Sequence, residues 1–367
     1  MDRCVFFNRA PVHYRKGIYL LLAQELDCDF YFGDSRPGGI KPIDVSILQN
    51  HFKGFFHNIR IGSFYWQRGV LRLLHSNYNN IITPGETYCL STWVLLFLAK
   101  RYNKKVYLWT HGAYGDESGI KKWLAKKRID LCTGAFLYGT YARDLLSRFG
   151  ADPDKLHVIY NSLSYDEDLV LRQNVVSSKI FQDHFSNTKK NIVFIGRLNR
   201  NKKLELILRA LSALTKQGHS YNLTLIGDGP ERQALVSLAR QLGLNNQIWF
   251  FGSCYDETMI SELLFNSDVC VSPGNVGLTA MHAMSFGTPV ISHNNWCRQM
   301  PEFEAIENGK TGAFFNENDV DDLAVVIHSW LDSMKDRETV RENCYQIIDE
   351  KYNPHIQIEV FKKVIFG

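Results

Sequence analysis

The stretch that decides the fold is residues 271–290, VSPGNVGLTAMHAMSFGTPV. It begins as an apolar strand, passes through a Pro-Gly-Asn loop and continues as a short helical pattern from Gly277 to Gly287. Gly274 and Gly277 leave backbone N–H groups uncovered at the start of that helix, which is typical of phosphate-binding sites. The segment therefore predicts an α/β sheet with an anion site at the end of a strand.

Two further strand-to-helix turns precede this stretch. One is FIGRLNRNKK at residues 194–203, where a glycine allows a tight exit from the strand. Its Arg197 and Lys202 supply two cations of the kind that bind a diphosphate. The other is LIGDGPE at residues 225–231, in which Gly-Asp-Gly-Pro ends a strand. A solvated basic helix start explains the first turn equally well, and a plain turn explains the second.

Short apolar runs alternate with helical patterns along most of the chain. The strand candidates of the first half are residues 4–8, 28–32, 80–83, 105–110 and 134–138. Those of the second half are residues 192–195, 223–226, 248–251, 269–272 and 290–292. Strands that alternate with helices predict doubly wound parallel sheets, and ligands bind beyond the carboxyl ends of such strands.

The length and one polar interval predict two domains. A chain of 367 residues is long enough for two, and the polar stretch 162–190 separates the two series of strands. We expect a first Rossmann-like domain over residues 1–165 and a second over 170–349, facing each other across a central cleft. The helical pattern at 350–367 is interpreted as packing back on the first domain.

The composition and charge of the chain limit the kinds of partner and the compartment that we expect. The chain is 45% hydrophobic with a net charge of +4, which argues against a nucleic-acid partner. Residues 1–170 hold 22 basic and 16 acidic side chains, so we expect an anionic partner on the first half. Eight scattered cysteines, the lack of a signal-peptide core and the lack of an apolar run of ~20 residues predict a cytoplasmic protein.

Taken together, the motifs resemble the second domain of the retaining glycosyltransferases of family 4, which have the GT-B fold. The resemblance covers roughly residues 155–330. It depends on the order and spacing of Val-Ile-Tyr-Asn at 158–161, Gly196-Arg197-Leu198 with Lys202, Gly-Asp-Gly-Pro at 227–230, Phe251-Gly252, and the segment from Gly277-Leu278 to Gly287-Thr288-Pro289-Val290. It implies sugar transfer, with retention, from a UDP- or GDP-sugar to a glycan or a lipid-diphosphate-linked acceptor. Bacterial surface or capsular polysaccharide biosynthesis is the setting that it suggests.

The resemblance also assigns roles in the second half. Arg197 and Lys202 would bind the donor diphosphate and stabilise the charge that develops on it. The positions expected to contact the donor are Gly196, Ser253, Gly274, Asn275, Val276, Gly277, Leu278, Thr279 and His282, with a helix near Tyr255 beside the nucleotide base. No cofactor and no metal are expected, because cationic side chains and a helix N-terminus would offset the diphosphate charge.

Two glutamates that the family usually has in the third loop are replaced. Alignment of the flanking residues puts Gly274 and His282 at their positions. An imidazole can form hydrogen bonds to a ribose in place of a carboxylate. Glycine has no side chain, so the neighbouring Asn275 is the candidate substitute. The replacements motivate an alternative, a catalytically inactive partner subunit that binds a nucleotide sugar.

Polar residues also follow three strands of the first half. By resemblance, His111 at the end of strand 105–110 would be catalytic and would contact the donor sugar. Position alone makes Arg9, His13, Arg15, Glu86 and Tyr114 candidate contacts of the acceptor. Ordinary solvated loops explain the same residues.

A basic segment, KKWLAKKR, runs from Lys121 to Arg128 around Trp123 and Leu124. On a helix it predicts either a face that lies on an anionic membrane surface or an ordinary amphipathic helix with a solvated face. The first interpretation would make the protein peripheral on the inner face of the plasma membrane.

Two other enzyme classes fit the sequence less well. A GT-B-like sugar-nucleotide epimerase would use the same diphosphate loops, with Glu86, His111 and His282 as acid and base groups. A dinucleotide oxidoreductase would need a Gly-x-Gly-x-x-Gly turn after a strand, and no such turn is present.

Overall fold

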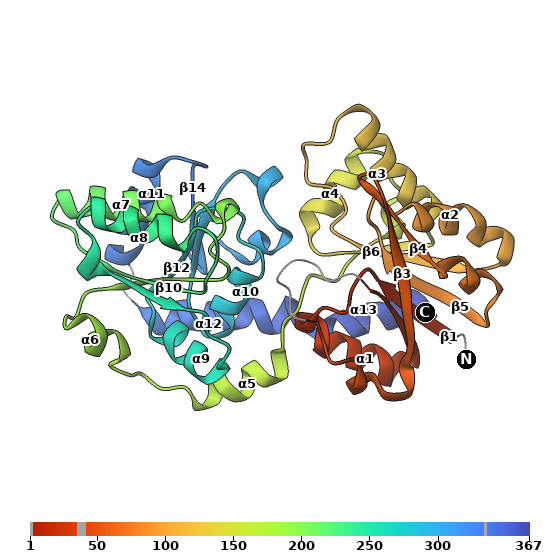
Figure 1. The fold of residues 1–367 in the computed structure, drawn as a ribbon, viewed down its shortest axis with the longest axis horizontal. Coiled ribbons are helices and arrows are strands. Elements are labelled where there is room, and N and C mark those ends of the chain that lie inside the picture. Colours follow the sequence, from red (N-terminus) through yellow and green to blue (C-terminus); the bar gives the residue numbers. More distant parts are fainter. Residues whose placement is uncertain (1–2, 35–41, 334–335) are drawn as a thin grey trace. The chain divides into compact units, whose positions relative to one another are not determined.

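The chain folds as two compact units, each built on its own sheet (Figure 1). In the computed structural model, unit 1 is Met1–Ser164 together with Lys351–Gly367, and unit 2 is Tyr165–Glu350. The structure describes residues 3–34, 42–333 and 336–367.

Unit 1 contains an eight-stranded sheet in the order β4-β3-β2-β1-β5-β6-β7-β8. Its strands are β1 (Arg3–Asn8), β2 (Cys28–Gly33), β3 (Phe52–Ile61), β4 (Phe64–Arg68), β5 (Tyr78–Pro84), β6 (Lys105–Thr110), β7 (Gly134–Leu137) and β8 (Leu156–Val158). Every neighbouring pair is parallel except β3 with β4. The sheet is thus parallel except at this edge, where the hairpin was not predicted. The sequence does not mark the hairpin as an apolar run, because polar and apolar side chains alternate along β3.

Helices cover both faces of this sheet. One hydrophobic cluster joins α2 (Leu90–Ala99), α3 (Gly119–Leu131) and α4 (Thr140–Arg148) to the sheet. The cluster on the other face holds α1 (Lys16–Leu26) and α13 (Pro354–Phe366). Successive residues of β1 enter opposite clusters, as the two-residue period of a strand requires. The ring of Phe361 lies 5.3 Å from that of Trp109, so the last helix is part of the core of unit 1.

Unit 2 contains a six-stranded parallel sheet in the order β11-β10-β9-β12-β13-β14. Its strands are β9 (Asn191–Ile195), β10 (Asn222–Ile226), β11 (Ile248–Gly252), β12 (Val269–Ser272), β13 (Val290–His293) and β14 (Gly312–Phe315). Its helices are α5 (Tyr165–Asn174), α6 (Ile180–Phe185), α7 (Glu205–Lys216), α8 (Arg232–Gln241), α9 (Glu257–Asn266), α10 (Leu278–Ser285), α11 (Val320–Ser333) and α12 (Arg337–Lys351). Two of them, α5 and α6, lie in the polar stretch that the sequence marked only as an interval between strands.

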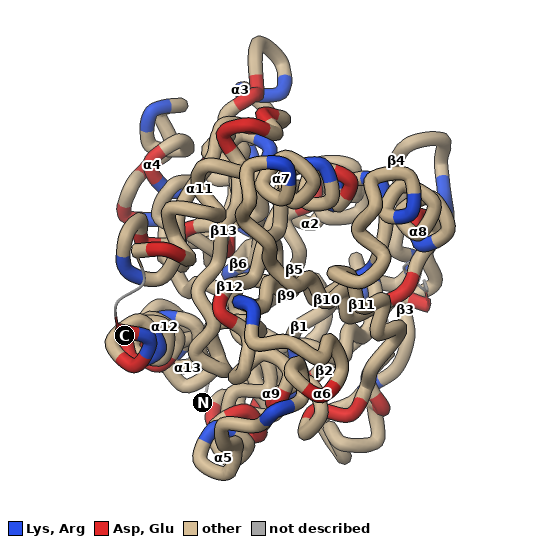
Figure 2. The backbone as a smooth tube through the Cα atoms, turned by 90° about the vertical axis from the view of Figure 1, so that its left-hand side faces the viewer, with Lys and Arg blue, Asp and Glu red and all other residues tan. Residues whose placement is uncertain are grey.

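The centre of the second sheet is apolar. Strands β9, β10 and β12 contain no Lys, Arg, Asp or Glu and are therefore tan in Figure 2. Because β9 lies between β10 and β12, the loops that follow these three strands leave the same edge of the sheet side by side. This edge carries the residues predicted to bind an anion.

Candidate active site

The loops after β9 and β10 contact each other through their backbones. The N–H of Gly196 donates to the carbonyl of Ile226 (2.9 Å). The N–H of Leu198 donates to the carbonyl of Asp228 (3.0 Å). A Cβ at Gly227 would lie 2.0 Å from the carbonyl oxygen of Gly196, so no larger residue fits there. The Gly-Asp-Gly-Pro turn therefore supports the β9 loop.

Lys202 joins the β9 loop to the β12 loop. Its Nζ donates to the backbone carbonyl of Asn275 (2.6 Å) and to Oδ1 of the same residue (3.1 Å). The N–H of Gly274 donates in return to the carbonyl of Lys202 (3.0 Å). Burial lowers the pKa of Lys202 to about 8, an effect that Glu302 partly opposes. The two loops are thus held together around a buried amine.

Gly274 has no room for a side chain. A Cβ there would lie 2.0 Å from the carbonyl oxygen of Asn201 and 2.7 Å from the Cα of Lys202. A glutamate at this position would push the two loops apart. The side chain of the next residue, Asn275, is the one that reaches Lys202.

Helix α10 begins beside the amine of Lys202. Gly277 caps the helix with φ 51° and ψ −150°, a conformation that L side chains rarely adopt. A Cβ at Gly277 would lie 4.0 Å from the Nζ of Lys202. Thr279 fixes the first turn, since its hydroxyl donates to the carbonyl of Ile195 (2.9 Å). Amides of a first helical turn have no partner inside the helix, so amides and ammonium together can bind a diphosphate.

The remaining residues that were predicted to contact the nucleotide-sugar donor differ in their exposure to solvent. Along the β12 loop, Asn275 and Leu278 are half-buried, whereas Gly274, Val276, Gly277 and Thr279 are buried. Arg197 is exposed on the β9 loop, and Ser253 is exposed after β11. The helix expected near Tyr255 begins at Glu257 instead, because the carboxylate of Asp256 caps it by accepting from Thr258 and Met259.

His282 on α10 lies among carboxylates that the sequence did not single out. Its Nε2 is 3.3 Å from Oε2 of Glu257. Burial raises the pKa of Asp168 on α5 to about 6, while His282 and a hydrogen bond from Ser285 act to lower it. The imidazole of His282 therefore lies beside the carboxylate of Glu257. In the sequence, Glu257 is marked only as an acid in the first turn of a helix, where such residues are common.

The shifted pKa of Lys202 predicts a pH dependence for the binding of a diphosphate at this site, with UDP as the probe. The ammonium form is the one that can pair with a diphosphate, and in the free protein it is lost as the pH rises through about 8. We expect the affinity to be constant between pH 7 and 7.5 and to fall above pH 8, by up to about tenfold per unit. Calorimetric titration at several pH values measures this.

The matched variant for that titration is Lys202→Arg, which stays charged throughout this range. Its affinity for UDP is expected to vary less with pH than that of the wild type. An equal decline in both proteins would show that another group is responsible. Cys270, which acts on Lys202, is not such a group, because burial raises its pKa to about 12.

Three of the candidate residues of unit 1 line one small pocket. Arg15, Glu86 and His111 surround a volume of about 80 Å³ at the carboxyl ends of β1, β5 and β6. The ring of His111 lies 4.7 Å from that of Tyr138. Burial and the charge of Arg15 lower the pKa of His111 to about 4. At neutral pH this histidine is therefore an uncharged group that can form hydrogen bonds.

The other candidate residues of unit 1 do not line this pocket. Arg9 is exposed and lies over the ring of Tyr65, at 5.1 Å. The hydroxyl of Tyr65 donates to Glu86 (2.6 Å). His13 is exposed. The backbone N–H of Tyr114 donates to Glu117 (2.7 Å), and its ring stacks 6.0 Å from that of His111.

The basic segment from Lys121 to Arg128 lies on α3, but it does not form a single exposed face. Arg128 is buried, and burial lowers its pKa to about 10. Lys126 pairs with Asp130 one turn later (2.7 Å). The exposed part of α3 is apolar as well as basic, since Ile120 is 76% exposed and Trp123 is 59% exposed.

The described residues hold neither a cluster of metal-ligating side chains nor a helix able to span a membrane. No group of three or more His, Cys, Asp or Glu side chains in residues 3–34, 42–333 and 336–367 is arranged to hold a metal ion. Within the same ranges, no helix has both the length and the apolar character needed to cross a bilayer.

Comparison with known proteins finds a family match in the second half of the chain. Residues 176–347, which lie inside unit 2, match the family model described as glycosyl transferases group 1. The whole chain is similar in fold to Anabaena HepE, solved in complex with UDP, with a TM-score of 0.73 and 16% identity over 100% of both chains. The fold of both proteins is GT-B, as the motifs predicted.

Two curated proteins are similar to this chain in sequence. An uncharacterized glycosyltransferase of Methanocaldococcus jannaschii is 26% identical over 255 residues, 66% of this chain and 62% of that protein. The matched region thus spans less than two thirds of the length of that relative. An uncharacterized 41.2 kDa protein from the cps region of Klebsiella pneumoniae is 23% identical over 86% of this chain and 78% of that protein.

Proposed function

We propose that the chain is a retaining glycosyltransferase that moves a sugar from a UDP-sugar to a glycan or lipid-linked acceptor. The observation that carries the proposal is the contact between Lys202 and Asn275 at the start of α10. It combines a cation, a side-chain amide and the amides of a helical first turn at the carboxyl edge of a parallel sheet. Bound UDP in HepE, which shares the fold, favours uridine over guanosine as the donor base.

The proposed chemistry needs charge stabilisation on the leaving diphosphate. As the bond between the sugar and the diphosphate breaks, negative charge grows on the phosphate oxygens. Lys202, buried beside the first turn of α10, would stabilise that charge more strongly than an exposed lysine, because little water competes with it. Arg197, exposed on the same loop, would add a second cation with planar, bidentate geometry.

The replaced glutamates are accommodated in the proposed donor site. Asn275 takes the place of the first, since Gly274 cannot hold a side chain. The pair of His282 and Glu257 takes the place of the second, with the imidazole bonding the ribose hydroxyls and the carboxylate orienting it. Ser253, exposed after β11, would lie toward the base.

Unit 1 is proposed to supply the remaining contacts. His111 would bond a hydroxyl of the donor sugar as a neutral imidazole, which agrees with the lowered pKa of its ring. Glu86 would accept the hydrogen bond of an acceptor hydroxyl. Arg9, His13 and Tyr114, placed around the same carboxyl edge of the sheet, would contact the acceptor outside the pocket.

Polysaccharide assembly at a bacterial surface is the proposed setting. It is supported by the relative from the cps region of Klebsiella pneumoniae. Peripheral contact with an anionic membrane would go through the exposed part of α3, where Ile120 and Trp123 lie beside Lys121 and Lys122.

Vesicle flotation measures that contact. We expect the protein to float with vesicles that contain anionic lipid and to stay behind with neutral ones. Trp123→Ser together with Lys122→Gln should abolish flotation. Equal behaviour with both kinds of vesicle would contradict a role for α3 at the membrane.

The experiment that tests the function is release of UDP from UDP-glucose and related UDP-sugars, with and without a mixture of cellular glycans and glycolipids. Release that depends on the acceptor and yields the α-linked product of an α-linked donor supports the proposal. Binding of UDP without turnover of any donor would support the inactive partner subunit instead. A free sugar nucleotide with altered stereochemistry would identify an epimerase.

A further inference from the structure

A positively charged side chain of unit 1 lies against aromatic rings with no carboxylate beside it. The guanidinium of Arg15 is 4.5 Å from the ring centroid of Trp109, and it donates to the hydroxyl of Tyr138. Within residues 3–34, 42–333 and 336–367, the groups that act on its charge are tyrosines, and no Asp or Glu forms an ion pair with it. Its Nε is buried and has no hydrogen-bond acceptor.

Two other arginines of the protein face carboxylates. The half-buried Arg172 donates to both oxygens of Asp349 at 3.0 Å. The buried Arg341 donates to both oxygens of Glu338 at 2.9 and 3.1 Å. The groups that raise the pKa of Arg15 against burial are tyrosines. A partly desolvated charge with no opposite charge beside it favours the entry of an anion.

The pocket beside Arg15 has room for an anionic group. Its volume of about 80 Å³ is enough for a few water molecules or for one carboxylate or phosphate. Glu86 lines another part of the same pocket without pairing with Arg15, and it accepts from the hydroxyl of Tyr65. The uncharged ring of His111 completes the lining.

We propose that Arg15 binds the carboxylate or phosphate group of an acidic sugar, so that the enzyme acts on an acidic sugar substrate. The planar guanidinium can hold either group through two parallel hydrogen bonds. Glu86 then selects a hydroxyl on the same sugar, since a second anionic group near it would be repelled. This inference rests on the proposed glycosyl transfer and adds the class of sugar to it.

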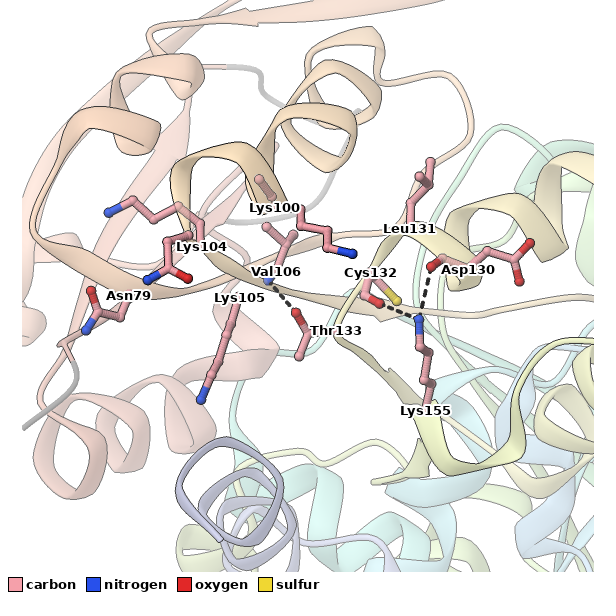
Figure 3. A pocket seen from close by; sticks show the side chains of 12 residues that line it. Asn79, Lys100, Lys104, Lys105, Val106, Asp130, Leu131, Cys132, Thr133 and Lys155 are labelled. Atoms are coloured by element: carbon pink, nitrogen blue, oxygen red, sulfur yellow. Dashed lines mark hydrogen bonds between the residues drawn. The ribbon is translucent and has the colours of Figure 1, made fainter.

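In a larger pocket of unit 1, lysines stabilise the fold by donating to backbone carbonyls. This pocket has a volume of about 480 Å³ and is lined by Lys100, Lys104, Lys105 and Lys155 (Figure 3). Lys155 donates to the backbone carbonyls of Asp130 (3.0 Å) and Cys132 (2.9 Å) at the end of α3. Lys104 donates to the carbonyls of Ser76 and Tyr78. Lys104 and Lys155 thus satisfy backbone carbonyls at the ends of helices and strands. Within the described part of the chain, the guanidinium of Arg15 donates to no backbone carbonyl; its hydrogen bond goes to the Tyr138 hydroxyl.

The test compares acidic and neutral ligands of the same shape. Dissociation constants are measured by NMR titration for methyl glucuronide against methyl glucoside, and for glycerol 3-phosphate against glycerol, as acceptor probes. UDP-glucuronate against UDP-glucose probes the donor. We expect the wild type to bind the acidic member of at least one pair at least tenfold more tightly. The pair that shows the preference identifies whether the acidic sugar is donor or acceptor.

Variants then assign the preference to Arg15. Arg15→Gln should remove it, and Arg15→Lys should keep part of it, because the charge remains but the bidentate geometry is lost. Arg101→Gln, which removes an exposed arginine of unit 1, should leave it unchanged. Melting temperatures verify that each variant is folded, and Arg15→Lys carries the test if Arg15→Gln does not fold.

Two results would overturn the inference. One is equal affinity for acidic and neutral members of every pair in the wild type. The other is an unchanged preference in folded Arg15→Gln. Titration with UDP keeps this separate from the proposed function: a protein that binds UDP without any preference for acids contradicts the acidic-sugar inference alone, and one that binds no UDP contradicts the donor site.

Discussion

Replacing Lys202 with alanine is expected to lower the affinity for UDP by about 100-fold and to lower turnover by a factor of about 10²–10³. The ammonium lies in a buried position between the β9 and β12 loops, where water screens its charge weakly. Alanine also removes the donor that Asn275 accepts from, so the start of α10 loses its support. Calorimetric titration with UDP and initial rates at saturating donor measure the two effects.

Lys216→Ala is the matched control for this substitution. Lys216 is an exposed lysine at the end of α7 in the same unit. Its loss should change neither UDP affinity nor turnover, because salt screens the charge of an exposed lysine outside the site. If Lys202→Ala bound UDP as tightly as Lys216→Ala, the diphosphate would have to lie elsewhere.

Replacing Gly274 with alanine is expected to abolish detectable UDP binding and to lower the free energy of unfolding by about 1–3 kcal/mol. The added Cβ would lie 2.0 Å from the carbonyl oxygen of Asn201, a backbone atom that cannot move without displacing the β9 loop. That displacement breaks the hydrogen bond from the Gly274 N–H to Lys202. Glutamate at position 274 should act in the same direction.

Gly17→Ala is the control for a change from glycine to alanine as such. A Cβ at Gly17 would meet its nearest atom at 3.4 Å, an ordinary contact, and Gly17 lies within α1. Alanine there should leave UDP binding intact and the free energy of unfolding equal or higher. Denaturant unfolding gives both stabilities. Unchanged UDP affinity in Gly274→Ala would contradict the close packing of the two loops.

The second sheet was predictable mainly because four of its strands, β9, β10, β12 and β13, are buried on both faces. Each of the five strands predicted there, from β9 to β13, agrees with the structure to within one residue at either end. The edge strand β14 was not predicted, since its four residues, Gly-Ala-Phe-Phe, are too few to form a clear pattern. The β3–β4 hairpin was missed because a strand that stays half exposed has no continuous apolar run.

The sequence predicted where the loops lie on the sheet, but it did not predict the contacts between them. Sequence spacing placed Lys202 and Asn275 on neighbouring loops without showing that they touch. Gly274 cannot hold a side chain because of the backbone carbonyl of Asn201, which lies 73 residues away in the chain. No local sequence pattern shows this contact. The carboxylate of Glu257 reaches His282 only because α9 and α10 come together in the fold.

The central claim is that unit 2 binds a nucleoside diphosphate at the start of α10. The most direct measurement is the melting temperature of the full chain with UDP, GDP, CDP and NAD, in the wild type and in Lys202→Ala. Ligand at a hundred times its dissociation constant should stabilise the protein by about 2.7 kcal/mol. We predict a clear rise with UDP that Lys202→Ala abolishes. No rise with any nucleoside diphosphate, or an equal rise in both proteins, would contradict the claim.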